Sequence, residues 1–466
     1  MNVDFDYQYQ YQHTSTIAMG SKDKSFILAH CSEIEQDNQV HCFFHGSIIN
    51  SFVASKCLST LGKTVRSHFA ISPDQRVNMR DPIVSVGNGQ LHFEAFSSCN
   101  SVYARIDVLQ TGIDGEFIQA GCTNVDFNDV TIRAFNTVGR TDKLIVGVGS
   151  NELKVITARA ETTEKKVSLP DRWIKGLGNV QVYLSQMELA FQLNRIEALQ
   201  LFKAIPKSAV KPEYFLSKSG KSYTFSAVAK PNSLKIGGIH RLNLIENLLI
   251  HVDSVSFYKH EDQQSTAVVL DFKDIQMLFL LSESVYRGFS GESKHIENLI
   301  VQLPEEWLLG INNYFKTNEV FQPTLVSIEH DIQLGTMATM QASLSSMGLL
   351  GYDLWSNNYF YRKLPFKLSR LKRFNPRLQN AVKLIDEDAV LLLQHDKNGI
   401  KAEVKGSANL SHIVVGKGND LQCTCSWFTN NRTNRGLCKH ILAVKMKLRS
   451  PSYNGPSCIL SPDQCD

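Results

Sequence analysis

The sequence predicts an α+β fold with three parts: a β-rich N-terminal region that contains an internal duplication, a winged-helix-like segment, and a small C-terminal ββα module. Three observations support this prediction. Apolar runs bounded by Gly, Asn and Asp occupy residues 21–160, as is typical of strands. Three helical patterns and a hairpin pattern follow one another within residues 305–366. A cluster of Cys and His residues precedes an apolar helical pattern close to residue 440.

The length of 466 residues and the hydrophobic content of 43% are typical of a globular protein with several domains. We expect a flexible leader at 1–20, a β-rich domain with one helix at 21–168, a second α+β unit at 169–304, a winged-helix-like unit with a basic segment at 305–383, the C-terminal module at 384–450, and a flexible tail at 451–466. The sequence has no secretory signal and no apolar run of about 18 residues, so we expect a reducing, cytoplasmic compartment and no membrane contact.

The first domain is expected to hold one helix among several strands. Residues 46–69 place apolar side chains at helical spacing between Ile48 and Val65. Strand patterns lie at 91–98, 101–109, 142–149 and 152–160. The phrase LPDRWIKGL at 169–177 is repeated in similar form as LPEEWLLGI at 303–311, and strand patterns precede both. We interpret this as a diverged duplication of a β-rich unit that ends in a helix, with chance similarity of two helix starts as the alternative.

The winged-helix-like segment is predicted from its order of elements. A helix candidate at 305–317 is followed by short helical patterns at 323–332 and 336–348, and a hairpin is expected around Ser356, Asn357 and Asn358. A recognition helix that reads DNA normally offers Arg, Lys, Asn or Gln to the base edges. The helix at 336–346 has no Arg or Lys, so a structural or protein-contact role is favoured over base readout.

Positive charge gathers near the C-terminus. The formal net charge of the chain is +4, but residues 362–450 hold 18 Lys or Arg against 6 Asp or Glu. Such asymmetry favours contact with a polyanion such as DNA, and the alternative is docking on an acidic protein surface. The candidate nucleic-acid contacts lie in a basic run from 362 to 383. The alternative interpretation of this run is a solvated connecting segment. The candidate contacts are Arg362, Lys363, Lys367, Arg370, Lys372, Arg373 and Arg377.

Four residues near the C-terminus have the chemistry and spacing of a metal site. Cys423 and Cys425 are followed after a loop by Cys438 and His440. Alternate residues of a strand face the same way, so the first two sulfurs can converge, while Cys438 is expected just before a helix whose first turn holds His440. Three thiolates and one imidazole favour a tetrahedral Zn²⁺. Because four protein ligands leave no open position, we expect one structural zinc ion.

This spacing resembles the SWIM zinc finger, and CTCSWFTNNRTNRGLCKH is similar to its core. Further phrases extend the resemblance over most of residues 40–445 to prokaryotic SWIM zinc-finger proteins. They are VRSHF, TNVDFN, LPDRWIKGL, YRGFSGE and GYDLWSNNYFYRKLPF. The resemblance implies that Cys423, Cys425, Cys438 and His440 hold zinc, and that the finger contacts DNA or proteins. It also implies protein partners such as MoxR-type ATPases and von Willebrand A-domain proteins.

The sequence as a whole predicts a non-catalytic zinc protein that acts as a DNA- or protein-interaction module, with a protein-only adaptor for such an ATPase system as the alternative. It holds no GxGxxG after a strand, no phosphate loop, no nucleophile elbow and no HExxH motif. We therefore expect no enzymatic activity.

Overall fold

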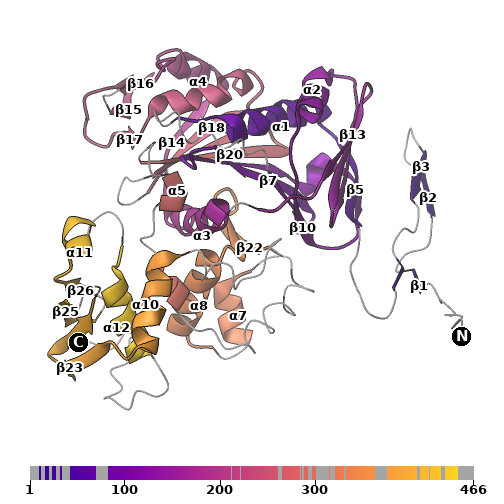
Figure 1. Ribbon diagram of the computed structural model, residues 1–466. Coiled ribbons are helices and arrows are strands. Elements are labelled where there is room, and N and C mark those ends of the chain that lie inside the picture. The colour runs from indigo at the N-terminus through magenta and orange to yellow at the C-terminus, as the bar shows by residue number, and fades with distance from the viewer. Residues whose placement is uncertain are drawn as a thin grey trace, which may run out of the picture.

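A computed structural model shows how the chain folds (Figure 1). The described residues are 42–69, 82–169, 171–210, 213–220, 222–260, 265–283, 285, 288–291, 296–300, 314, 318, 321–329, 332–362, 375–406, 410–418, 420–431 and 436–449, with the backbone of four short N-terminal strands. These strands form two separate pairs. They are β1 (Gln10–Tyr11), β2 (Thr16–Met19), β3 (Lys24–Ile27) and β4 (Ser32–Glu33).

The largest element is an antiparallel eight-stranded sheet in the order β10-β6-β7-β8-β20-β19-β18-β14. Its strands are β6 (Ile83–Gly87), β7 (Gln90–Phe96), β8 (Val102–Val108), β10 (Gly121–Asn124), β14 (Met187–Asn194), β18 (Ser254–His260), β19 (Ser265–Asp271) and β20 (Ile275–Ser282). The pairing of β8 with β20 joins strands from both sides of residue 168. The domain boundary expected there therefore crosses one continuous sheet and one hydrophobic core.

Two smaller sheets extend this region. A five-stranded sheet in the order β13-β12-β11-β5-β9 consists of β5 (Cys42–Ile48), β9 (Ile113–Phe117), β11 (Leu144–Gly149), β12 (Glu152–Ile156) and β13 (Glu161–Lys165). A three-stranded sheet in the order β16-β15-β17 consists of β15 (Tyr214–Ser219), β16 (Ser222–Ser226) and β17 (Leu234–Ile236). The predicted strands at 91–98, 101–109, 142–149 and 152–160 correspond to β7, β8, β11 and β12.

Helices cover one side of these sheets. They are α1 (Ser51–Arg66), α2 (Asp129–Thr137), α4 (Arg195–Phe202) and the 3-10 helix η3 (Ile239–Leu248). The predicted helix at 46–69 is α1, which begins after Asn50 because the Asn50 side chain accepts a hydrogen bond from the Val53 amide. It contacts strands of both larger sheets, and Figure 1 shows it lying between α4 and α2.

The opposite side of the eight-stranded sheet is covered by α3 (Asp171–Leu184) and by the hairpin of β21 (Leu350–Asp353) and β22 (Asn358–Tyr361). Trp173 of α3 is fully buried against Phe96. At Gly178 a Cβ atom would lie 1.9 Å from the Ser346 carbonyl oxygen, so only glycine permits the close approach of α3 to α8 (Leu334–Ser346). The echo of the α3 phrase at 303–311 lies outside the described residues.

The winged-helix-like segment is described in part. The helices α7 (Pro323–Glu329) and α8 and the β21–β22 hairpin follow the predicted order, while the helix expected at 305–317 lies outside the described residues except Tyr314. The helix α8 buries Met337, Met340 and Leu344 and contacts α3, α7 and β21. Its apolar face is therefore used within the chain.

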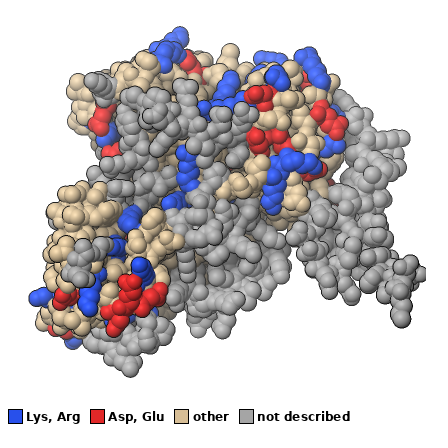
Figure 2. Space-filling model, in the orientation of Figure 1, with Lys and Arg blue, Asp and Glu red and all other residues tan. Residues whose placement is uncertain are grey.

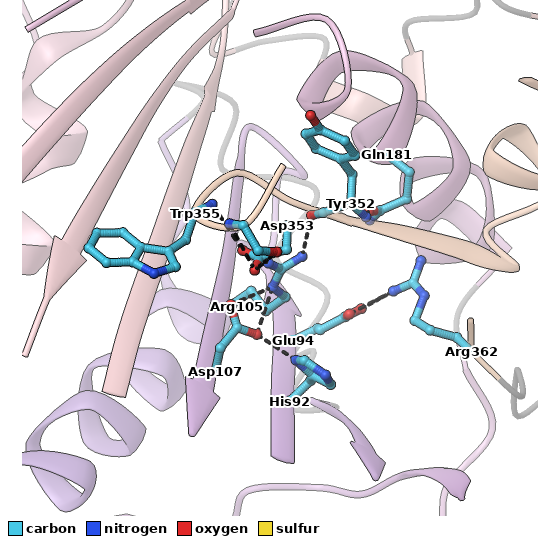
Figure 3. Close-up of polar contacts among 10 residues, drawn as sticks. His92, Glu94, Arg105, Asp107, Gln181, Tyr352, Asp353, Trp355 and Arg362 are labelled. Atoms are coloured by element: carbon cyan, nitrogen blue, oxygen red, sulfur yellow. Dashed lines mark hydrogen bonds and ion pairs between the residues drawn. The ribbon is translucent and has the colours of Figure 1, made fainter. Parts of the chain in front are cut away.

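A charged junction fixes the hairpin to the sheet (Figure 3). Arg105 of β8 forms an ion pair with Asp107 at 2.8 Å and donates a 2.8 Å hydrogen bond to the Tyr352 carbonyl oxygen. On β7, Glu94 forms an ion pair with Arg362 just after β22, and both side chains are almost completely buried. Because the hydrogen bonds cross between distant parts of the chain, they hold residues 350–362 in a single position on the sheet.

The C-terminal module has its own sheet and core. Four antiparallel strands, β23 (Val390–Asp396), β24 (Gly399–Lys405), β25 (Ser411–Lys417) and β26 (Asp420–Cys423), pair in sequence order. The helix α12 (Lys439–Leu448) packs on this sheet, the helix α10 (Pro376–Asp386) packs on α12 within the same core, and the short α11 (Ser426–Asn431) lies beside β26. The predicted ββα unit is thus larger, with four strands and three helices among the described residues.

The short η4 helix (Ile296–Ile300) connects this module to the rest of the chain. Ile296 and Ile300 belong to the core of the C-terminal module. Asn298 donates a 3.0 Å hydrogen bond to the Ser346 hydroxyl of α8. Among the described residues, no helix has both the length and the hydropathy needed to cross a bilayer.

Candidate metal centre

Four side chains from three local segments form the centre. Cys423 ends β26, and Cys425 lies in the turn before α11. Cys438 is the residue before α12 and His440 is the second residue of that helix, as predicted. Gly436 adopts a φ of 70°, a conformation that glycine reaches at little cost, where the chain returns toward Cys438.

The four ligand atoms fit a single tetrahedral ion. The three Sγ atoms and one imidazole nitrogen all lie within 4.8 Å of one another. The His440 Nδ1 atom is 3.7 Å from Cys423 Sγ and 4.0 Å from Cys438 Sγ. A tetrahedral Zn²⁺ with Zn–S distances of about 2.3 Å and a Zn–N distance of about 2.0 Å separates its ligand atoms by roughly 3.5–3.8 Å. The geometry therefore matches a site that contracts slightly around the ion.

The backbone supports negative charge on the sulfurs. The Cys425 amide donates to Cys423 Sγ at 3.5 Å, and the Phe428 amide donates to Cys425 Sγ at 3.3 Å. A hydrogen bond with Cys423 lowers the pKa of the Cys438 thiol to about 4, while the same hydrogen bond and burial raise the pKa of Cys423. Burial also raises the pKa of Cys425. One thiolate thus forms readily, and a bound cation is needed to keep all three ionised.

The tautomer of His440 follows from its orientation. Its Nδ1 atom faces the sulfurs, so Nε2 carries the proton when a metal is bound. The buried Nε2 atom has no hydrogen-bond partner in the described part of the chain. The His412 ring of β25 packs against His440 with centroids 4.4 Å apart, and it covers this ligand.

The centre is part of the hydrophobic core of the module. The three cysteines are at most 7% exposed and pack with Ile441, Leu442 and Val444 of α12. On the same helix Lys445 is buried and forms a 2.7 Å ion pair with Glu297 of η4. The metal ligands therefore fix α12, and α12 in turn contacts the element that leads to α8.

The basic run is distributed differently from the expectation. Arg362, predicted to contact nucleic acid, is 2% exposed and paired with Glu94, so its guanidinium is not presented to a ligand. The Arg377 guanidinium lies over the Trp427 ring at 4.6 Å and donates a 2.8 Å hydrogen bond to the Leu437 carbonyl oxygen. It supports the loop beside Cys438. Lys363, Lys367, Arg370, Lys372 and Arg373 lie outside the described residues.

Sequence reasoning identified the four ligands but missed their supports. The ion pair of Lys445 with Glu297 joins residues 148 positions apart, and the stacking of Arg377 on Trp427 joins two separate helices. No local pattern announces either contact. The α11 helix was missed because its sequence, SWFTNN, is rich in residues that favour turns.

Comparison with known proteins agrees with this centre. Residues 407–448 match the SWIM zinc finger family. The C-terminal module contains a SWIM zinc finger, and its buried Cys3His cluster is a structural zinc site. None of the curated proteins matches the chain.

Two solved structures are similar over about half of the chain. One is the Proliferating Cellular Nuclear Antigen from Entamoeba histolytica, with a TM-score of 0.35 and 9% identity over 52% of this chain and 98% of that chain. The other is the PCNA2–PCNA3 complex from Sulfolobus tokodaii, with a TM-score of 0.37 and 10% identity over 52% of this chain and 99% of that chain.

Proposed function

We propose that this chain is a non-catalytic interaction protein, in which zinc holds the C-terminal module in the shape that binds nucleic acid, a partner protein, or both. The observation that carries the proposal is the closed ligand set. Cys423, Cys425, Cys438 and His440 occupy four positions around one point, and all four are buried. A zinc ion held in this way has no open position for a substrate or a reactive water. Its contribution is therefore to folding and not to chemistry.

The nucleic-acid version rests on the excess of positive charge in residues 362–450. Since Arg362 and Arg377 have structural partners, the basic residues to test are Lys372 and Arg373. The double variant K372Q/R373Q should weaken the salt-dependent mobility shift of a DNA fragment, because each lost phosphate contact reduces counterion release. The exposed pair-forming residue Lys165 provides a control, K165Q, outside this region. Equal shifts for all three proteins would remove the basic run from the account.

The protein-only version is favoured by the outer face of the four-stranded sheet. Leu391 is 58% exposed and Val415 is 41% exposed on that face, while the inner face packs on α12. Contiguous exposed apolar patches are typical of protein contact surfaces, and we infer that Leu391 and Val415 belong to such a patch. By family resemblance the partner is a MoxR-type ATPase or a von Willebrand A-domain protein.

One experiment separates the two versions. The tagged chain and its C438S variant are used as baits in pull-downs from native cells, with and without nuclease. A nucleic-acid module releases its co-purifying material after nuclease, whereas an adaptor retains a protein that L391D/V415D loses and V228D, an exposed apolar control, keeps. Identical material on wild type and C438S would contradict any role for the zinc-held shape.

A further inference from the structure

A group of basic side chains lies far from the zinc module, on the helices of the N-terminal region. The helices α1 and α2 run antiparallel, since Arg66 pairs with Asp129 at one end and the Arg140 guanidinium lies over the Phe52 ring at 5.5 Å at the other. Between these ends the Ser59 hydroxyl donates to Asn136 at 2.7 Å. The two helices thus form one continuous surface on the side of the sheets that faces away from α3 and the hairpin (Figure 1).

Four basic side chains of this surface have no acidic partner in the described part of the chain. They are Lys56 and Lys63 of α1, Arg133 of α2, and Arg140 just after α2. Lys63, Arg133 and Arg140 are exposed, and Lys56 is half-buried. Several other surface cations in this region are paired, such as Lys165 with Glu152 and Lys207 with Glu246. We call the four residues the α1–α2 basic track. Figure 2 shows Lys and Arg side chains along this edge of the molecule, with acidic ones between them.

One end of the track is organised around an aromatic ring. The Lys56 ammonium lies over the Phe52 ring at 5.1 Å, so this ring holds both Lys56 and Arg140. The edge of His251 meets the same ring with centroids 5.3 Å apart. Arg195, the first residue of α4, brings a further guanidinium to this end, where it is shared with Asp253 at 3.3 Å. Burial, followed by the charges of Arg140, Lys56 and Arg195, lowers the pKa of His251.

The arrangement is costly without an anion. Like charges that converge from α1, α2 and α4 repel one another, and within the described residues the one acid that pairs with a cation at this end is Asp253, on Arg195. The first turn of α1 contains no acidic residue, so the positive end of its dipole adds to the local potential. Two exposed isoleucines, Ile49 and Ile250, flank this end at 59% and 61% exposure. Cations beside apolar side chains suit a ligand that combines phosphates with flat apolar groups.

The shape of the track indicates the kind of anion. Lys56 and Lys63 are seven residues apart on one helix, which places them on the same face about 10 Å apart along the axis. A single phosphate cannot span this distance, whereas a nucleic acid presents a row of phosphates. We propose that the α1–α2 basic track is a nucleic-acid-binding surface separate from the zinc module, which contacts the phosphate backbone.

The test measures binding of labelled single-stranded and double-stranded oligonucleotides by fluorescence anisotropy at several salt concentrations. The variant K56Q/K63Q/R133Q/R140Q removes the track. The matched control K165Q/K207Q neutralises two paired cations elsewhere, and K56Q/R140Q removes the same number of charges from the track. We expect the quadruple variant to bind oligonucleotides roughly tenfold or more weakly at low salt. On duplex DNA the magnitude of the slope of log K against log salt should fall by up to about 3.6.

Four outcomes would overturn the proposal, and the last of them concerns the C438S variant. The first is absence of binding by the wild-type protein at low salt. The second is equal affinity of K56Q/R140Q and K165Q/K207Q. The third is binding of the wild type to vesicles of phosphatidylserine and phosphatidylcholine without binding to oligonucleotides, which would assign the track to a lipid surface. The C438S variant separates this proposal from the zinc-module function, since loss of binding in C438S alone would place all nucleic-acid contact on the zinc module. Thermal unfolding of each variant confirms that it is folded.

Discussion

The buried ion pair between Glu94 and Arg362 yields the sharpest stability prediction. Glu94 is fully buried and Arg362 is 2% exposed, and the Arg362 Nε atom also donates to the Gly348 carbonyl oxygen at 3.1 Å. In the variant E94A that carbonyl is the one remaining partner, within the described residues, of a guanidinium that stays out of water. Removing one partner of such a pair costs about 3–5 kcal/mol, or roughly a hundredfold to several-thousandfold in the opening equilibrium.

The assay has to detect opening of the hairpin as well as global unfolding. Hydrogen–deuterium exchange of the amides in residues 350–361 reports local opening, and urea unfolding followed by circular dichroism reports the whole chain. The control is E152A, which breaks the exposed pair with Lys165 and should cost less than about 1 kcal/mol. The double variant E94L/R362M removes both charges and should recover most of the loss. If E94A exchanged its hairpin amides no faster than E152A, the junction would not hold the hairpin as argued.

Three further predictions follow from other sites. Elemental analysis should find one zinc ion per wild-type chain and less than one in C438S, and residues 420–448 of the variant should be more sensitive to protease. Stoichiometric zinc in C438S would contradict the ligand assignment. The variant G178A should lose about 1–3 kcal/mol of unfolding free energy because its Cβ meets the Ser346 carbonyl oxygen. The control G335A has open space around its Cβ and should be neutral or slightly more stable. Equal urea midpoints for the two variants would refute the close approach. Burial opposes ionisation of Asp107, but Arg105 and a hydrogen bond with His92 hold its pKa below the usual 3.8. The stability that the Asp107 carboxylate contributes is therefore complete above pH 3.8 and is lost as the pH falls through the lower folded pKa. The variant D107N should lose less stability on acidification than wild type, and a greater loss would contradict this.

Local patterns in the sequence predicted much of the metal centre and many elements. The spacing of the ligands decided the site because it requires a strand end, a turn and a helix start, and these are short-range features. The α8 helix and the β21–β22 hairpin were likewise visible from apolar spacing and turn residues. The fold class, α+β with a β-rich N-terminal region and a C-terminal zinc cluster, agrees with the structure.

Contacts between residues far apart in the sequence could not be predicted from local patterns. Arg362 appeared to be one more cation in a basic run, yet its partner Glu94 lies 268 positions away on β7. The pairing of β8 with β20 also joins distant segments, and no local pattern in the sequence identifies the partner of either strand. The basic run was therefore interpreted as a uniform surface, although two of its members have structural roles at opposite ends of the segment.

The dependence of α12 on η4 bears on how the molecule can be divided. A fragment that starts at residue 384 would contain all four zinc ligands but neither Glu297 nor the two isoleucines of η4. Its Lys445 ammonium would lose the ion pair with Glu297, and part of the apolar surface of α12 would be uncovered. Loading such a fragment with metal would restore the coordination sphere, but α12 would still lack the η4 residues that pack against it. Shortened versions intended for binding studies should therefore retain the chain from before residue 296.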